Sequence, residues 1–186
     1  HVIVLSDEIH CDIVESGKEY IPFASVSKTN EQNSITCIAP TKTFNLAGLQ
    51  TSCIVVPNPV LRHKVNRGIN TDEVAEPNSF AMTALVTAFT KGEPWLNELR
   101  SYIDQNKARV VEFVQENLPE LHVIESHATY LMWIDCSKVS VDSVELVEFI
   151  REKTGLYLSD GAEFWANKII EIYGKKETDK QKILDA

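Results

Sequence analysis

Short apolar runs separated by polar turns occupy the first third of the chain. Val2–Leu5, Ser34–Ile38 and Cys53–Val56 have the length and the apolar content of strands. The polar run Ser27–Asn33 between two of them predicts a loop. Because Val2–Leu5 is apolar throughout, we expect a central strand that is buried on both faces. The pattern therefore predicts part of a mainly parallel sheet, whose other strands would precede His1.

From Asn78 onward the hydrophobic positions follow a helical spacing. A first helix is predicted to end at Gly92, and Pro94 suits the first turn of a second helix, which Pro119 ends. One apolar stripe runs along this second helix at three-to-four-residue spacing: Leu96, Leu99, Ile103, Val110, Phe113, Val114 and Leu118. Residues 1–93 are therefore assigned to a partial large domain and residues 94–118 to a linking helix.

Residues 119–164 predict a small C-terminal α+β domain. The expected elements are two strands, a helix and a strand, namely Leu121–Glu125, Thr129–Asp135, Ser143–Lys153 and Leu156–Leu158. Asp142 and Glu145 resemble a capping box at the start of the helix, and Gly155 follows its end. Residues 165–186 are Lys-rich and weakly patterned, so we expect little regular structure in this divergent tail.

Composition narrows the class of protein. The chain of 186 residues is 44% hydrophobic and 24% charged, which predicts a packed core. A net charge of -9 argues against binding to nucleic acid, and no apolar run approaches the roughly 18 residues of a membrane helix. The cysteines and histidines are scattered, so no metal site is expected. Reduced thiols and the lack of a signal peptide predict a cytoplasmic protein.

Two polar residues follow predicted strands of the first domain. Asp7 follows Val2–Leu5, and Lys42 follows Ser34–Ile38. In open α/β sheets ligands bind beyond the carboxyl ends of strands. A lone aspartate there is more often a turn or cap residue, and a lone lysine in a loop is usually a solvated charge. Together, however, they match pyridoxal 5'-phosphate (PLP), which needs a lysine amine and a carboxylate against its pyridine nitrogen.

The residues around Lys42 suit such a cofactor. A reactive lysine must be partly desolvated or lie near other cations. Lys42 stands between Thr41 and Thr43 and is followed by apolar Phe44, Leu46 and Leu49, so we expect a partly buried amine. The Thr41 hydroxyl could donate a hydrogen bond to the cofactor phosphate.

Several segments together resemble the cystathionine β-lyase-like C–S lyases of the class I/II aminotransferase superfamily, which have PLP fold type I. The resemblance runs from Val2 to Phe164. The segments that carry it are Ser6-Asp7-Glu8-Ile9-His10, Ala39-Pro40-Thr41-Lys42-Thr43-Phe44-Asn45-Leu46-Ala47-Gly48-Leu49, Gly92-Glu93-Pro94-Trp95-Leu96 and Thr129-Tyr130-Leu131-Met132-Trp133-Ile134-Asp135. The lysine segment is the most specific of them.

The resemblance implies a role for each matching residue. Lys42 corresponds to the lysine that holds PLP as a Schiff base and moves the substrate α-proton. Asp7 corresponds to the aspartate that pairs with the pyridine nitrogen, and Thr41 to a hydroxyl on the phosphate side. His10 falls where relatives carry a residue near the O3′ oxygen of the cofactor. Tyr130 lies near the substrate entrance in relatives, although core packing is the more ordinary interpretation of a tyrosine on a predicted strand.

The sequence also departs from this family. The cofactor-stacking aromatic residue, an asparagine and a glycine-rich phosphate turn would all precede His1. The arginine that clamps the substrate carboxylate in relatives has no counterpart, because no arginine follows Arg151. A frameshifted or altered tail after Phe164 would explain this loss. Trp95 and Trp133 are interpreted as core residues.

Three functions follow from the resemblance. The first is a PLP-dependent C–S β-lyase that converts cystathionine or cysteine-type substrates into a thiol, pyruvate and ammonia. The second is a class I/II aminotransferase, which would share Lys42 and Asp7. The third is an inactive fragment, or a subunit that another chain completes. A homodimer is the expected assembly, and a small amino acid is the expected substrate.

Overall fold

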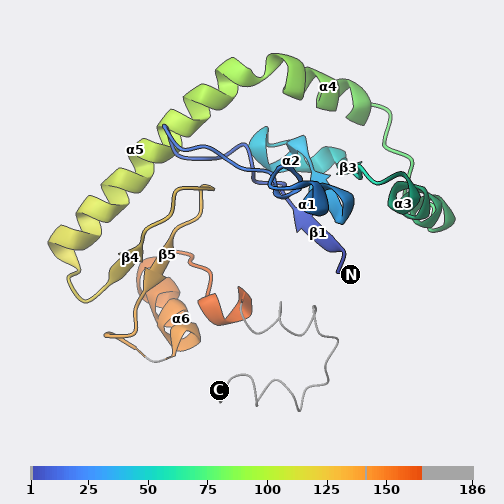
Figure 1. The fold of residues 1–186 in the computed structure, drawn as a ribbon. Coiled ribbons are helices and arrows are strands. Elements are labelled where there is room, and N and C mark those ends of the chain that lie inside the picture. Colours follow the sequence, from blue (N-terminus) through green and yellow to red (C-terminus); the bar gives the residue numbers. More distant parts are fainter. Residues whose placement is uncertain (1, 141, 165–186) are drawn as a thin grey trace, which may run out of the picture. The chain divides into compact units, whose positions relative to one another are not determined.

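The computed structural model describes residues 2–140 and 142–164 (Figure 1). Residues up to Glu112, together with Glu125–Trp133, form one compact unit (unit 1); Phe113–Ile124 and the described residues from Ile134 onward form the other (unit 2). The strands are β1 (Val4–Asp7), β2 (Ser34–Ile38), β3 (Cys53–Val55), β4 (His122–Ile124) and β5 (Trp133–Asp135). The α-helices are α1 (Lys28–Gln32), α2 (Pro40–Thr43), α3 (Pro59–Thr71), α4 (Ala81–Lys91), α5 (Glu93–Asn117) and α6 (Ser143–Thr154).

Unit 1 is built on a three-stranded sheet in the order β1-β2-β3. Strands β1 and β2 are parallel, with Val4 opposite Ser34 and Asp7 opposite Cys37, whereas β2 and β3 are antiparallel. The predicted strand at residues 34–38 is confirmed, and so is the parallel pairing of the first two strands. Because both parallel strands run toward the same edge, the residues that follow Asp7 and Ile38 emerge on one side of the sheet.

The prediction that the first strand is buried on both faces is wrong for this chain. Strand β1 begins at Val4 rather than Val2, and the side chain of Leu5 is 67% exposed. The reason is the position of β1 at the edge of the described sheet, where β2 is its only strand neighbour. A strand is buried on both faces only where other layers cover it, and the described residues supply no such layers around Leu5.

Besides α2, which is described with the candidate site, two helices were not expected from the hydrophobic pattern. The polar run predicted as a loop contains α1, whose N-cap is Ser27, with a hydroxyl that accepts from the Asn30 amide (3.1 Å). Helix α3 begins after Asn58, whose side-chain oxygen accepts from the amides of Val60 and Leu61, and Pro59 occupies its first turn. The dipeptide Asn58-Pro59 is a strong start signal that hydrophobic periodicity alone does not detect.

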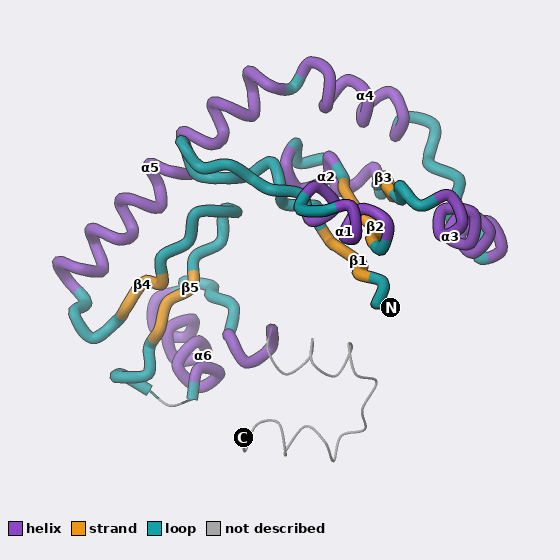
Figure 2. The backbone as a smooth tube through the Cα atoms, viewed as in Figure 1, coloured by secondary structure: helices purple, strands orange, loops and turns teal. Residues whose placement is uncertain are grey.

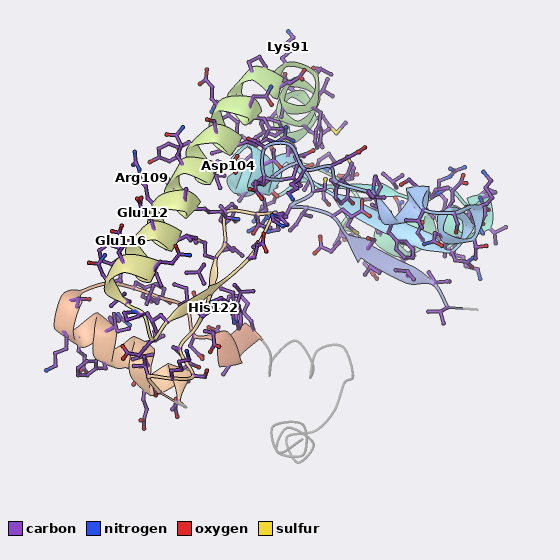
Figure 3. All side chains as sticks on the ribbon, turned by 60° about the vertical axis from the view of Figure 1, so that its left-hand side comes forward. Lys91, Asp104, Arg109, Glu112, Glu116 and His122 are labelled. Atoms are coloured by element: carbon purple, nitrogen blue, oxygen red, sulfur yellow. The ribbon has the colours of Figure 1, made fainter. Side chains whose placement is uncertain are left out.

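Helices α4 and α5 confirm the predicted helical region and meet at Gly92. The buried apolar residues among the described residues of unit 1 are few: Ile13, Ala39, Pro40, Val56, Ala81, Ala88 and Leu96. Asp104 of α5, which Figure 3 labels, accepts hydrogen bonds from the amide (3.1 Å) and hydroxyl (2.6 Å) of Ser16. This pair fixes the helix to the long loop after β1, most of which Figure 2 draws in teal.

Unit 2 contains the β4–β5 pair and helix α6. The N-cap and C-cap of α6 are confirmed, because the Asp142 carboxylate accepts from the amides of Val144 and Glu145 and Gly155 adopts a left-handed φ of 74°. The reciprocal bond of a capping box is not formed, since the Asp142 amide donates to the Ser140 hydroxyl (3.1 Å) instead of to Glu145. The strand predicted at residues 156–158 is wrong, since this segment follows the C-cap without a pairing partner among the described residues. The expectation for the tail, residues 165–186, lies outside the described residues.

The two tryptophans interpreted as core residues are not buried. Trp95 and Trp133 are 45% and 52% exposed, because the described chain covers only part of each ring.

None of the helices in residues 2–140 and 142–164 is long and apolar enough to cross a membrane.

Candidate functional site

Two hydrogen bonds join the loop that follows β1 to β2 and to the segment after β2. The Glu8 amide donates to the Cys37 carbonyl (2.8 Å), which continues the β ladder by one residue beyond Asp7. Further on, the Thr43 hydroxyl donates to the Asp12 carboxylate (3.2 Å). One bond therefore lies on the Asp7 side and the other next to Lys42. The two predicted site segments share one edge of the sheet in unit 1.

Asp7 presents its carboxylate at this edge. The side chain is exposed, and Oδ1 accepts from the Ile9 amide at 3.3 Å. Among the described residues no second donor to this carboxylate is present. Burial raises the pKa of the neighbouring Cys37 thiol, and the negative charge of Asp7 adds to this rise. A carboxylate that accepts one backbone hydrogen bond and is otherwise exposed can pair with a cationic ligand atom.

Lys42 lies in α2, a single helical turn and not the loop that the sequence predicts. Pro40 and Thr43 are buried, whereas Lys42 is exposed, so the expected partial burial of its amine is wrong in this chain. The reason is helical geometry, since residues three apart share a face and the residue between them points elsewhere. The Lys42 ammonium makes no ion pair within the described part of the chain.

An aromatic cluster fixes the end of α2. The ring of Phe44 lies edge-on to Phe89 of α4 (centroids 6.1 Å apart) and tilted against Trp95 of α5 (5.7 Å). Gly92, between α4 and α5, faces the same ring, and a Cβ atom on it would overlap both Phe44 and the Ala88 carbonyl. Gly92 therefore provides the space that lets Phe44 pack, two residues from Lys42.

Glu8 is a polar residue of this region that the sequence interpretation missed. It is buried, and its Oε1 accepts from the Ser6 hydroxyl (2.8 Å) and from the Phe23 amide (3.1 Å). Burial, together with the adjacent Glu8, strongly raises the pKa of Tyr20. Ser6 lies in β1 and Glu8 follows the strand by one residue, so the two side chains, two residues apart in extended backbone, share a face. This spacing is the signal that could have identified the pair. Glu8 stabilises the loop that follows Asp7.

His10 and Thr41 complete the predicted set, and both are half-buried. The Nδ1 atom of His10 is buried and has no hydrogen-bond partner among the described residues. Its imidazole lies edge-on to the ring of Tyr130, with centroids 5.5 Å apart. Core packing, the favoured interpretation of Tyr130, is wrong, because the side chain is 43% exposed.

The donor set fits PLP. Lys42 offers a primary amine, Asp7 a carboxylate, Thr41 a hydroxyl and His10 an imidazole. Asp7 is the last residue of β1, and the other three lie in the segments that follow β1 and β2. An amine and a carboxylate are the two groups that this cofactor requires of a protein. Asp12 also belongs to the site region, since it bonds to Thr43 and its carbonyl accepts from Arg100 of α5 (2.8 Å).

Comparison with known proteins gives a consistent family. Residues 1–172 match the family model described as aminotransferase class I and II. The chain is 38% identical over 163 residues to cystathionine beta-lyase PatB of Bacillus subtilis, covering 88% of this chain and 42% of the relative. Protein MalY of Escherichia coli is 28% identical and 40% of it is covered. The chain thus spans about two fifths of the length of the curated relatives that it matches.

Solved structures agree with this result. A PLP-bound aminotransferase from Clostridium difficile, which its description calls putative, superposes with a TM-score of 0.84 at 36% identity, over 88% of this chain and 42% of that chain. A PLP-bound C–S lyase from Staphylococcus hominis gives 0.77 at 32% identity, over 88% and 41%. The fold is therefore the α/β fold of PLP fold type I enzymes. This chain belongs to the class I and II aminotransferase family, whose members depend on PLP.

Proposed function

We propose that the protein acts as a PLP-dependent C–S β-lyase on cystathionine or related cysteine-type amino acids. The observation that carries this proposal is the pairing of β1 with β2, which brings the segments of Asp7 and Lys42 to one edge of the sheet. Relatives that are named cystathionine β-lyase or C–S lyase support the reaction class. The overall reaction would convert the amino acid and one water molecule into a thiol, pyruvate and ammonia.

Each site residue has a role in this proposal. Lys42 would hold the cofactor through its amine and, once that amine is free, would accept the α-proton of the substrate. Asp7 would pair with the protonated pyridine nitrogen, Thr41 would donate to the phosphate, and His10 would lie on the O3′ side. PLP, when bound, withdraws electrons from the substrate Cα and so makes the α-proton acidic. Asp12 and Thr43 would keep the two segments in register.

The finer organisation belongs to the same proposal. Residues 1–93 would form part of the PLP-binding large domain, α5 would link it to a small C-terminal domain over 119–164, and residues 165–186 would form a divergent tail. A homodimer, or completion of the site by another chain, would supply groups that these residues lack. The substrate carboxylate, for example, has no arginine partner after Arg151 in this sequence.

An aminotransferase is the second candidate. The PLP-bound Clostridium difficile structure, at 36% identity, is described as an aminotransferase, and this observation favours it. Both reactions begin with removal of the α-proton, so they would share Lys42 and Asp7. They differ in whether a thiolate leaves from Cβ or an amino group is transferred to a keto acid.

A labelling experiment tests the cofactor site first. The protein is incubated with PLP, reduced with borohydride and mapped by mass spectrometry. We expect a covalent adduct on the peptide that contains Lys42, and none in the Lys42→Ala variant. Lys91→Ala is the matched control, because Lys91 is an exposed lysine at the end of α4 (Figure 3) and should leave the adduct unchanged. A folded protein without adduct at Lys42 would support an inactive fragment.

Product analysis then distinguishes the two reactions. Pyruvate released from cystathionine without any keto acid supports the lyase, whereas keto-acid-dependent consumption of the amino donor supports the aminotransferase. Loss of a general base lowers rates by about 10²- to 10⁴-fold, so Lys42→Ala should reduce either activity at least that much. An active Lys42→Ala enzyme would contradict both assignments.

A further inference from the structure

The segment Ser126–Tyr130 packs on the loop after β1, and both belong to unit 1. Val14 and Ala128 form an isolated antiparallel bridge. The Glu15 amide donates to the His127 carbonyl (2.8 Å), and the Thr129 amide donates to the Ile13 carbonyl (2.7 Å). Backbone bonds on both sides of the bridge thus fix residues 127–129 against residues 13–15.

Side chains strengthen the same contact. The His127 ring lies 2.5 Å from the Glu15 carboxylate through Nδ1, and Lys107 of α5 donates to the Ala128 carbonyl (3.2 Å). Ile13 is one of the most buried side chains in the described chain. Residues 126–130 are therefore fixed by backbone and side-chain hydrogen bonds, next to the buried side chain of Ile13.

The backbone at Thr129 is strained. Its φ is +59°, a left-handed value that is a genuine outlier for a β-branched residue. Its hydroxyl accepts from the Leu131 amide at 3.1 Å, so both sides of the turn around Tyr130 are fixed. A strained φ value persists only where surrounding contacts hold the residue in that conformation. Such residues are concentrated at functional sites.

The result of this turn is the position of Tyr130. Its ring meets the imidazole of His10 edge-on, at an interplanar angle of 62°. His10 lies three residues after Asp7, and no described residue bonds to its buried Nδ1. The Tyr130 ring is therefore a contact that restricts the orientation of the His10 imidazole, which lacks a hydrogen bond at Nδ1 among the described residues.

We propose that Tyr130 is a positioning residue of the PLP site, which the strained turn at Thr129 holds against His10 so that the imidazole keeps one orientation toward the cofactor. This inference rests on the proposed function only in that PLP is the cofactor of the site. The His10–Tyr130 contact does not depend on that proposal. Tyr130 acts through His10, so its effect depends on the presence of that imidazole.

The test is a double-mutant cycle in the full-length protein with two measurements. The first is the dissociation constant of PLP, from the absorbance of the bound cofactor. The second is the NMR signal of the His10 ring, recorded without PLP. Tyr130→Leu removes the aromatic edge and should weaken PLP binding about 2- to 10-fold, the range expected from an aromatic pair. It should also shift the His10 ring signals.

Control variants separate positioning from general stability. Tyr130→Phe keeps the ring and should give the same PLP dissociation constant and His10 ring signals as the parent protein. Tyr102→Leu alters an exposed tyrosine of α5 and should change neither measurement. Thr129→Val removes the hydroxyl that accepts from the Leu131 amide and should reproduce part of the Tyr130→Leu effect. Equal thermal midpoints would show that the variants are folded.

The decisive comparison uses His10→Ala. In that background Tyr130→Leu should change PLP affinity by less than about 2-fold, because the two residues act as one unit. An equal loss in both backgrounds, or unchanged His10 signals in Tyr130→Leu, would overturn the proposal. Failure of the proposed function gives a different outcome: PLP does not bind, while the His10 signals still shift without it.

Discussion

Units 1 and 2 are stabilised in different ways. In unit 1, hydrogen bonds join residues that are far apart in sequence, such as Asp12 with Arg100 and Ser16 with Asp104. In the described part of unit 2, the polar bonds join residues that are closer in sequence, such as Asp142 with Val144, two residues apart, and Ser143 with Asp160, 17 residues apart. Val114 is the one buried apolar residue of unit 2 within the described chain, whereas unit 1 holds several.

This difference locates the site. Asp7, His10, Thr41 and Lys42 all lie in unit 1, so their relative positions depend on contacts that cross long stretches of sequence. Helix α6 of unit 2 depends on its own caps. Substitutions at long-range contacts of unit 1 should therefore disturb the site as well as stability, and substitutions in α6 should have local effects.

The largest expected effect is that of Gly92→Ala. A Cβ atom at this position overlaps the Ala88 carbonyl, which belongs to the backbone of α4, and the ring of Phe44. Overpacking of this kind costs about 1–3 kcal/mol of unfolding free energy. Because Phe44 lies two residues from Lys42, PLP binding should weaken too. Denaturant titration and PLP absorbance measure the two effects.

Gly68→Ala is the matched control. Gly68 lies inside α3, and a Cβ atom there meets nothing within 4 Å. Alanine in a helix interior is favoured over glycine by roughly 0.5–1 kcal/mol, so this variant should be more stable than the parent. If Gly92→Ala also increased the free energy of unfolding, the packing role assigned to Gly92 would be wrong.

A pair of buried threonines gives the next test. Thr43→Val removes the hydroxyl that donates to Asp12 and leaves a carboxylate oxygen without this donor. Loss of such a bond costs about 1–3 kcal/mol. The Thr36 hydroxyl of β2 is also buried but has no partner among the described residues. Thr36→Val should therefore be neutral or stabilising, and equal losses in the two variants would contradict the role of the Asp12–Thr43 bond.

The candidate site residues rest on a local signal in the sequence, whereas their surroundings depend on long-range contacts. Lys42 and Asp7 follow apolar strands, and this local signal is visible in the chain. Glu8 and Asp12 were missed because their importance comes from partners at distant positions, namely Phe23 and Thr43. Periodicity describes one element at a time, so it cannot report which side chains meet.

The same limit explains the errors in the fold. Helix α3 was missed because its start signal, Asn58-Pro59, is a capping feature rather than a hydrophobic one. The caps of α6 were predicted because all of their groups lie within a few residues of one another. Exposure of Leu5 could not be predicted, since burial of a strand depends on which layers lie over it.

Asp142→Ala tests the local character of unit 2. It removes the N-cap of α6 and should cost about 1 kcal/mol in helix stability, while Asp142→Asn should keep most of the cap. Hydrogen exchange at the Val144 and Glu145 amides should accelerate in the alanine variant alone. PLP binding should stay unchanged in both, and a clear loss of PLP affinity would show that α6 influences the site.

The smallest effect concerns Asp160. The hydroxyl of Ser143 and the amides of Ala162 and Glu163 donate to its carboxylate, and they hold its pKa below the ordinary value of 3.8. A carboxyl group whose pKa is lower in the folded than in the unfolded chain stabilises the fold above pH 3.8, and this stabilisation is lost as the pH falls through the folded pKa. An NMR titration should give a midpoint below 3.8. Ser143→Ala removes the largest cause and should raise that midpoint, whereas an unchanged midpoint would mean that the two amides alone determine it.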